Sequence, residues 1–178
     1  MNIQSPIQQN LCKSTIPPGL CGQPTESKII INGIETSSLL DTGSTVSTIA
    51  HEFYTQHFTD TPLKPLEQII SIECADGNSL PYHGYIEANI QLKETDQHYP
   101  TILLVVPDSP YHSKVPVLLG TNILTTIMDN YKDRFGNRFL QTSDLTTPWY
   151  SSFRCILLRE KELRKMNNRL ALIKSAEY

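Results

Sequence analysis

Alternating apolar and polar residues predict strands in the first two thirds of the chain. Residues 28–31 (KIII) run into Asn32-Gly33, a dipeptide that favours a two-residue hairpin turn because both positions tolerate positive φ. Residues 34–40 form the predicted return strand, which ends at Asp41. The pattern therefore places a carboxylate at the end of an apolar strand.

A longer hairpin is predicted further along the chain. The apolar run at residues 69–75 leads into a tight tip, and the alternating segment YIEANIQL at 85–92 follows it. Residues 101–106 and 115–120 are short Val-containing runs bounded by prolines, which is typical of buried strands. We expect strands to dominate as far as Gly120.

Helical spacing appears before and after this stretch. Residues 51–58 predict one or two helical turns before a proline break, and apolar residues recur at helical spacing from Thr121 to a stop at Gly136. A further helix is predicted at residues 151–168, with Glu160 able to pair with Arg164. The apolar face of this helix comprises Phe153, Ile156, Leu157 and Leu163. The ending LALIKSAEY is predicted to be a strand.

Length and composition set the domain organisation. The 178 residues, 39% hydrophobic and 19% charged, fit one globular domain with extensions. Residues 1–26, polar and rich in Pro, Ser and Thr, predict a flexible arm or linker. The domain itself is placed at residues 27–135. Residues 136–178 are expected to form a C-terminal extension of one helix and a terminal strand.

Charge and cysteine usage narrow the functional classes. Residues 1–149 hold 8 Lys and Arg against 15 Asp and Glu, whereas residues 150–178 hold 7 against 3. The acidic body disfavours nucleic-acid binding, and the basic end has interleaved acids typical of a solvated helix face. Four scattered cysteines predict free thiols in an intracellular protein, and the five histidines show no metal-ligand spacing. No metal, cofactor or membrane span is expected.

The segment Leu40-Asp41-Thr42-Gly43-Ser44 carries the candidate chemistry. Gly43 permits a sharp turn that brings backbone N–H groups close to the carboxylate, and the flanking hydroxyls can fix the loop. A carboxylate held in this way can act as a general base on water. A surface turn is the alternative, since all four residues after Leu40 are common turn formers.

A second segment strengthens the functional interpretation. Leu118-Leu119-Gly120 combines a buried strand, a glycine and the start of a helix. Together with Asp-Thr-Gly-Ser and the hairpin between them, this order resembles the retropepsin family, especially proteases of Ty3/gypsy-like retrotransposons, over residues 28–131. The resemblance implies a mainly β subunit with the closed barrel of the acid proteases, one lobe per chain, and a short helix after the Leu-Leu-Gly strand.

The resemblance also implies roles for individual residues. Asp41 would be catalytic, Thr42 would hydrogen-bond to its mate across a homodimer interface, and Gly43 and Ser44 would shape the same loop. The strand behind the loop would be formed by Leu118, Leu119 and Gly120. The tip of a flap over the substrate would be formed by Ala75, Asp76, Gly77 and Asn78.

The resulting hypothesis is an aspartic endopeptidase that acts on polypeptide, a retroelement polyprotein, as a homodimer in the cytoplasm or in a retroelement particle. Two carboxylates are needed, one as base and one as acid, and the chain has one Asp-Thr-Gly. Thr45 and Thr121 depart from many viral members, which have an acidic residue and an arginine there. A catalytically silent dimerisation or peptide-binding module is the alternative, and a silent fragment of a larger polyprotein is a third possibility.

Overall fold

The computed structural model describes residues 25–66, 72–74, 76–93 and 95–176. These residues form six strands, three α-helices and one 3-10 helix. The strands are β1 (Glu26–Ile31), β2 (Ile34–Leu40), β3 (Ser47–Ala50), β4 (Gly84–Leu92), β5 (His98–Val106) and β6 (Val117–Leu119). The helices are α1 (His51–His57), α2 (Thr121–Phe135), η1 (Gly136–Gln141) and α3 (Thr147–Ala176).

The first hairpin forms where the sequence predicts it. Asn32 and Gly33 both have positive φ, 46° and 88°, which matches the twist of the strands that they join. β1 begins at Glu26, two residues before the predicted start, and Thr25 already exchanges hydrogen bonds with Leu40. The ordered part therefore reaches into the predicted arm, of which residues 1–24 lie outside the described part of the chain.

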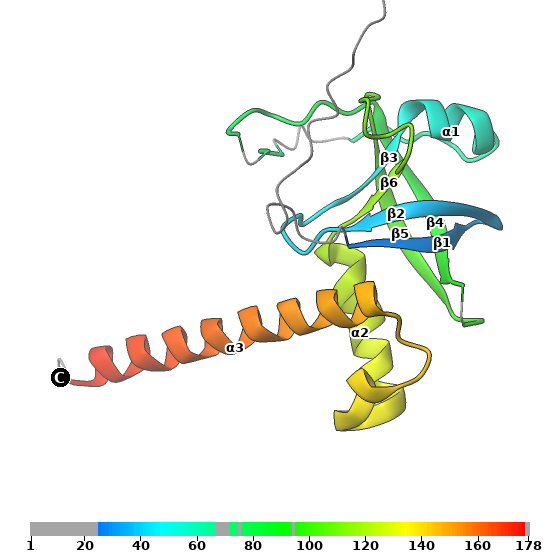
Figure 1. Cartoon of the computed structure of the whole chain (residues 1–178). Coiled ribbons are helices and arrows are strands. Elements are labelled where there is room, and N and C mark those ends of the chain that lie inside the picture. The colour runs from blue at the N-terminus through cyan, green and yellow to red at the C-terminus, as the bar shows by residue number, and fades with distance from the viewer. Residues whose placement is uncertain (1–24, 67–71, 75, 94, 177–178) are drawn as a thin grey trace, which may run out of the picture.

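The six strands close into a barrel in the order β1-β2-β6-β3-β5-β4 (Figure 1). β4 pairs antiparallel with both β1 and β5, which closes the sheet on itself. Two pairings are parallel, β2 with β6 and β3 with β5. The mainly β closed barrel expected from the sequence is confirmed.

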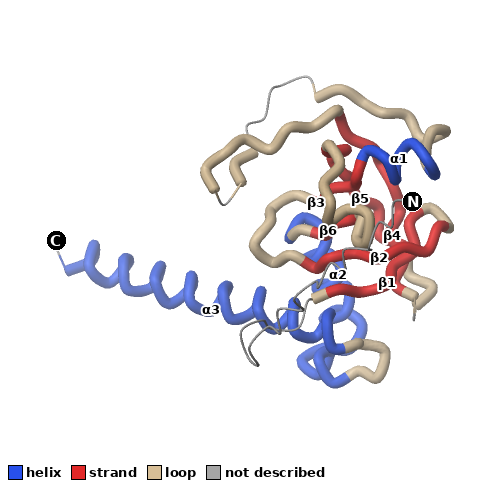
Figure 2. Tube along the Cα trace, turned by 45° about the horizontal axis from the view of Figure 1, so that its top comes forward, coloured by secondary structure: helices blue, strands red, loops and turns tan. Residues whose placement is uncertain are grey.

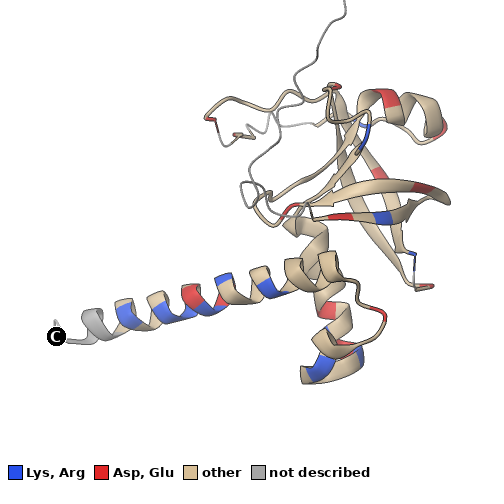
Figure 3. Ribbon diagram, viewed as in Figure 1, with Lys and Arg blue, Asp and Glu red and all other residues tan. Residues whose placement is uncertain are grey.

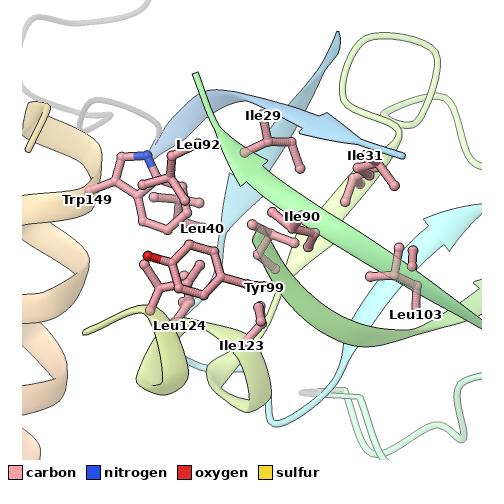
Figure 4. Close-up of a cluster of buried hydrophobic side chains, with 14 of the residues drawn as sticks. Ile29, Ile31, Leu40, Ile90, Leu92, Tyr99, Leu103, Ile123, Leu124 and Trp149 are labelled. Atoms are coloured by element: carbon pink, nitrogen blue, oxygen red, sulfur yellow. The ribbon is translucent and has the colours of Figure 1, made fainter. Parts of the chain in front are cut away.

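Apolar residues from every strand fill the barrel, and α2 closes one end of it (Figure 4). Ile123, Leu124 and Ile127 of α2 are at most 1% exposed, as helical spacing predicts. The helix ends before Gly136, whose φ of 60° suits a glycine at a helix C-terminus. α2 therefore fixes the position of β6, which leads directly into it.

The C-terminal extension differs from its prediction. The predicted terminal strand is wrong, because α3 continues as one helix to Ala176 (Figure 2). No Gly or Pro occurs from Trp149 onward, so nothing in the sequence stops the helix. Phe153 and Ile156 are buried as predicted, but Leu163 is 54% exposed because α3 has by then left the body of the protein. The Glu160–Arg164 pair forms at 4.0 Å.

Candidate active site

The loop that follows β2 presents the Asp41 side chain at the end of the strand. The Gly43 N–H donates to Asp41 Oδ1 at 2.8 Å, and the Ser44 N–H donates to the Asp41 carbonyl at 3.3 Å. A Cβ on Gly43 would lie 3.1 Å from that same carboxylate oxygen, which is a tight contact. The loop therefore binds one carboxylate oxygen by backbone, and a side chain at position 43 would press on that same oxygen.

The Asp41 side chain is half-buried in the single chain, which leaves its carboxylate accessible. The Asp41 N–H donates to the Leu119 carbonyl of β6 at 2.9 Å. The backbone of the carboxylate residue is thus held in the sheet while its side chain faces outward.

The glycine at the end of β6 packs directly under the loop. A Cβ on Gly120 would collide with the carbonyl group of Val46, so the approach of the two backbones depends on glycine. Thr121 adds two contacts from its N–H and its hydroxyl to the Ser44 carbonyl, at 2.8 and 3.1 Å. The predicted supporting strand and the predicted loop are therefore brought together by the fold.

Ser47 is a supporting residue that the sequence reasoning missed. Its side chain is fully buried, accepts the Gly120 N–H at 2.9 Å and donates to Asn122 Oδ1 at 2.7 Å. The signal in the sequence was Ser47 itself, a polar residue in an apolar strand, together with the polar Asn122 two positions after Gly120. Ser47 ties β3 to the start of α2 beneath the loop.

Two residues of α3 also reach the loop. Arg159 Nη1 donates to the Thr42 carbonyl at 2.5 Å, and Cys155 Sγ lies 3.4 Å from Thr42 Oγ1. Both contacts join residues more than 110 positions apart, so no local pattern could have predicted them. α3 therefore braces the loop from the side opposite β6.

The predicted flap forms a short hairpin at its tip. The Cys74 N–H donates to the Asn78 carbonyl at 2.7 Å, and Glu73 forms a bridge with Ser79. Asp76, Gly77 and Asn78 are all exposed, and Gly77 has a φ of 80°. Ala75 lies outside the described residues. The hairpin and the Asp41 loop lie on the same side of the barrel (Figure 1).

The pKa of the Asp76 carboxyl is lowered by hydrogen bonds within its own turn. The Asn78 N–H donates to Asp76 Oδ1 at 3.0 Å, and the Asn78 amide donates to Oδ2 at 2.8 Å. Both bonds favour the charged form, so they lower the pKa of the Asp76 carboxyl below its ordinary value. Both oxygens of this carboxylate therefore accept hydrogen bonds from the same turn.

A hollow of about 500 Å³ lies between α1 and the loop before β6, away from Asp41. Within the described ranges no cluster of three or more potential metal ligands occurs. No described helix is long and apolar enough to cross a membrane. Acidic residues are distributed over the barrel, and basic residues recur along the length of α3 (Figure 3).

Comparisons with known proteins give structural neighbours only. No protein-family model matches the chain, and no curated protein sequence does. The fold is similar to the EIAV protease complexed with the inhibitor HBY-793, with a TM-score of 0.45 and 22% identity over 64% of this chain and 93% of that one. It is similar to the retroviral protease-like domain of Ddi1 from Leishmania major, with a TM-score of 0.44 and 12% identity over 60% and 78%.

A third neighbour is the Simian Foamy Virus (mac) protease, with a TM-score of 0.37 and 18% identity over 60% of this chain and 96% of that chain. The function proposed below rests on the residues around Asp41 and on the loop that holds them.

Proposed function

We propose that the chain is a subunit of an aspartic endopeptidase whose active site is completed by a second copy. The observation that carries this proposal is the Asp41 loop. Its carboxylate is accessible, is bound by the Gly43 N–H, and stands on a backbone anchored to Leu119. A carboxylate held so firmly at a strand end is suited to position a water molecule for attack on a peptide carbonyl.

Peptide hydrolysis by this chemistry needs two carboxyl groups with different protonation states. One ionised group takes a proton from water, while the protonated group donates a hydrogen bond to the carbonyl oxygen that becomes the oxyanion. Aspartic proteases are the known example of two adjacent carboxyls sharing one proton, because two like charges at contact distance cannot both persist. The proposed site therefore requires a second acid close to Asp41.

The described chain offers no other loop suited to that role. Asp108 accepts the Glu52 N–H at 2.9 Å and so supports the start of α1. Asp76 is bound by Asn78 in an exposed hairpin tip. Asp41 of a second copy is the simplest source of the second carboxyl, because a two-fold axis beside the loop brings identical groups together.

The substrate class that we propose is an extended polypeptide lying between the paired Asp41 loops and the two flap hairpins. The exposed tip at Asp76–Asn78 has no core contact to lose when it moves over a peptide. A polyprotein of a retroelement, processed inside the cell or in a particle, is the substrate and setting that the sequence resemblance suggests.

The proposal is tested by mixing subunits. The wild-type chain is assayed on a peptide library by mass spectrometry, with Asp41→Asn subunits added at a threefold excess. If two Asp41 carboxylates are needed, random pairing leaves about one quarter of the activity. The rate should also have a bell-shaped dependence on pH that belongs to the pair of carboxyls.

A self-sufficient subunit would show no effect of the added variant, and that outcome would refute the shared site. A chain that binds peptides in the same library but cleaves none would instead be the peptide-binding module considered above. Equal binding by wild-type and Asp41→Asn chains would support this second function, since binding does not need the proton transfer.

A further inference from the structure

The second half of α3 extends away from the body of the protein (Figure 1). Every residue from 161 to 171 is exposed. At 1.5 Å of rise per residue, the 17 residues from 160 to 176 extend about 25 Å past the barrel. Most helical stability in proteins comes from packing of an apolar face, and this half of α3 has its large apolar side chains exposed.

The projecting half presents one apolar face, which we call the α3 stripe and define as Leu163, Met166 and Leu170. These side chains are 54%, 56% and 53% exposed. Their spacing of three and four residues places them on one side of the helix. Ile156 lies on the same side about two turns before Leu163 and is only 5% exposed, because the body covers it.

Along this side of the helix, Ile156 is covered by the body, Arg159 contacts the Asp41 loop, and the α3 stripe beyond them is uncovered. The first half of this face packs on the strands and on α2, and the second half packs on nothing in the described part of the chain. Apolar residues at this spacing form the seam along which helices pack against a partner. The α3 stripe is therefore a docking surface.

Its position points to the occupant. Arg159 and Cys155 contact Thr42, so α3 passes directly beside the loop that must meet its copy in the proposed enzyme. The helix leaves the body on the side toward which this loop faces, as both views show (Figures 1 and 2). Any two-fold axis beside the loop also passes beside this part of α3, and the projecting half then lies on the partner's side.

The distribution of charge also favours a position of α3 against a second copy of the chain. Residues 159–169 carry five Lys or Arg and two Glu, whereas residues 1–149 carry 8 basic and 15 acidic residues (Figure 3). A basic helix lying against an acidic body gains favourable long-range electrostatic energy. A second copy of this chain supplies such a body.

We infer that the α3 stripe docks on a second copy of the chain, with each α3 crossing beneath the Asp41 loops to reach the partner. This inference rests on the proposed function, because it names the surface that pairs the two subunits. The contact of Arg159 with Thr42 then links the docked helix to the position of each catalytic loop.

The test measures self-association of the full chain by sedimentation equilibrium, on an Asp41→Asn background so that no cleavage interferes. Leu163→Ser is compared with Leu158→Ser, a matched control. Leu158 is 55% exposed on a different side of the same helix. Leu163→Ser should raise the dimer dissociation constant by about tenfold, and serine at all three stripe positions by on the order of a thousandfold. Leu158→Ser should change it by less than about threefold.

Circular dichroism of each variant at high and low concentration shows whether the helix is retained. Equal association by the triple variant and its parent, with the helix intact, would overturn the inference. Loss of pairing by Leu158→Ser to the same extent would also overturn it, because the surface would then not be the stripe. A chain that stays monomeric until a short single-stranded RNA is added would assign the basic helix to nucleic acid and would equally overturn it.

The two proposals can fail separately. Cleavage that depends on Asp41 together with a triple variant that still pairs would remove the α3 stripe but keep the enzyme. Pairing that depends on the stripe in a chain without any cleavage activity would keep the docking surface and remove the enzyme.

Discussion

Two turns in this protein carry an aspartate with a glycine one or two positions after it, and they differ in what holds them. In both, the aspartate accepts an N–H from the residue two positions on, Gly43 for Asp41 and Asn78 for Asp76. The turn at Asp76 is closed by bonds within its own hairpin and is exposed. The loop at Asp41 is held in addition by β6 and by α3.

The comparison shows that the local turn chemistry does not make a site. Asp76 has the stronger local hydrogen bonding, with two donors from Asn78, and within the described part of the chain both come from its own turn. Asp41 has one local donor and a backbone fixed by Leu119. Catalysis needs a side chain whose position is fixed by the surrounding structure. Asp41 meets this condition better than Asp76 does.

The largest expected difference is in activity. Asp41→Asn should lower the rate of peptide cleavage by about 10²–10⁴-fold, because the amide keeps the shape but cannot accept a proton. Asp76→Asn changes a flap residue that takes no part in the proton transfer, so it should leave the rate at saturating peptide within about threefold and act on KM instead. Initial rates at saturating peptide measure both. A similar loss in the two variants would remove the distinction between the loops.

The two glycines should differ in stability. Gly120→Ala should lower the free energy of unfolding by about 3 kcal/mol, since the new methyl group collides with the Val46 carbonyl group. Gly77→Ala places its methyl group in open space and costs at most about 1 kcal/mol, from its φ of 80°. Urea denaturation followed by circular dichroism measures both changes. Equal losses would show that the Asp41 loop is no better supported than the hairpin tip.

The smallest expected effect is on the pKa of Asp76 and on stability at acid pH. Because Asn78 lowers the pKa of Asp76 in the folded protein, this bond contributes stability above the ordinary pKa of an aspartate. That contribution is lost as the pH falls through the lowered folded pKa. Asn78→Ala should therefore raise the pKa of Asp76, measured by NMR titration of its carboxyl carbon. The backbone N–H remains in the variant, so an unchanged pKa would show that the side-chain amide bond of Asn78 does not form.

Much of the barrel could be predicted because its signals are local. Asn32-Gly33 fixes one turn, and alternation fixes β4 within one residue of its observed start. The terminal helix was mistaken for a strand because a short apolar run such as LALI has no period of its own. In the structure the run belongs to a helix that began more than twenty residues earlier, at Thr147.

The residues of the candidate site also fall into two groups, those that local sequence signals identify and those that only tertiary contacts reveal. Asp41 and Gly43 could be identified because they belong to one short motif, and Gly120 because the close approach of its backbone to Val46 depends on glycine. Cys155 and Arg159 could not, because their contacts with Thr42 depend on how α3 docks on the finished barrel. Residues that act through tertiary contact leave no pattern in the sequence around them.

The anchor of α3 also gives the protein an optical reporter. Trp149 is the only tryptophan, is 1% exposed, and donates its Nε1–H to Ser27 Oγ of β1 at 2.9 Å. Its indole therefore senses a dry environment only while the helix remains attached to the first strand. Tryptophan emission reports detachment of α3 by a shift to longer wavelength, independently of the far-ultraviolet signal of the strands.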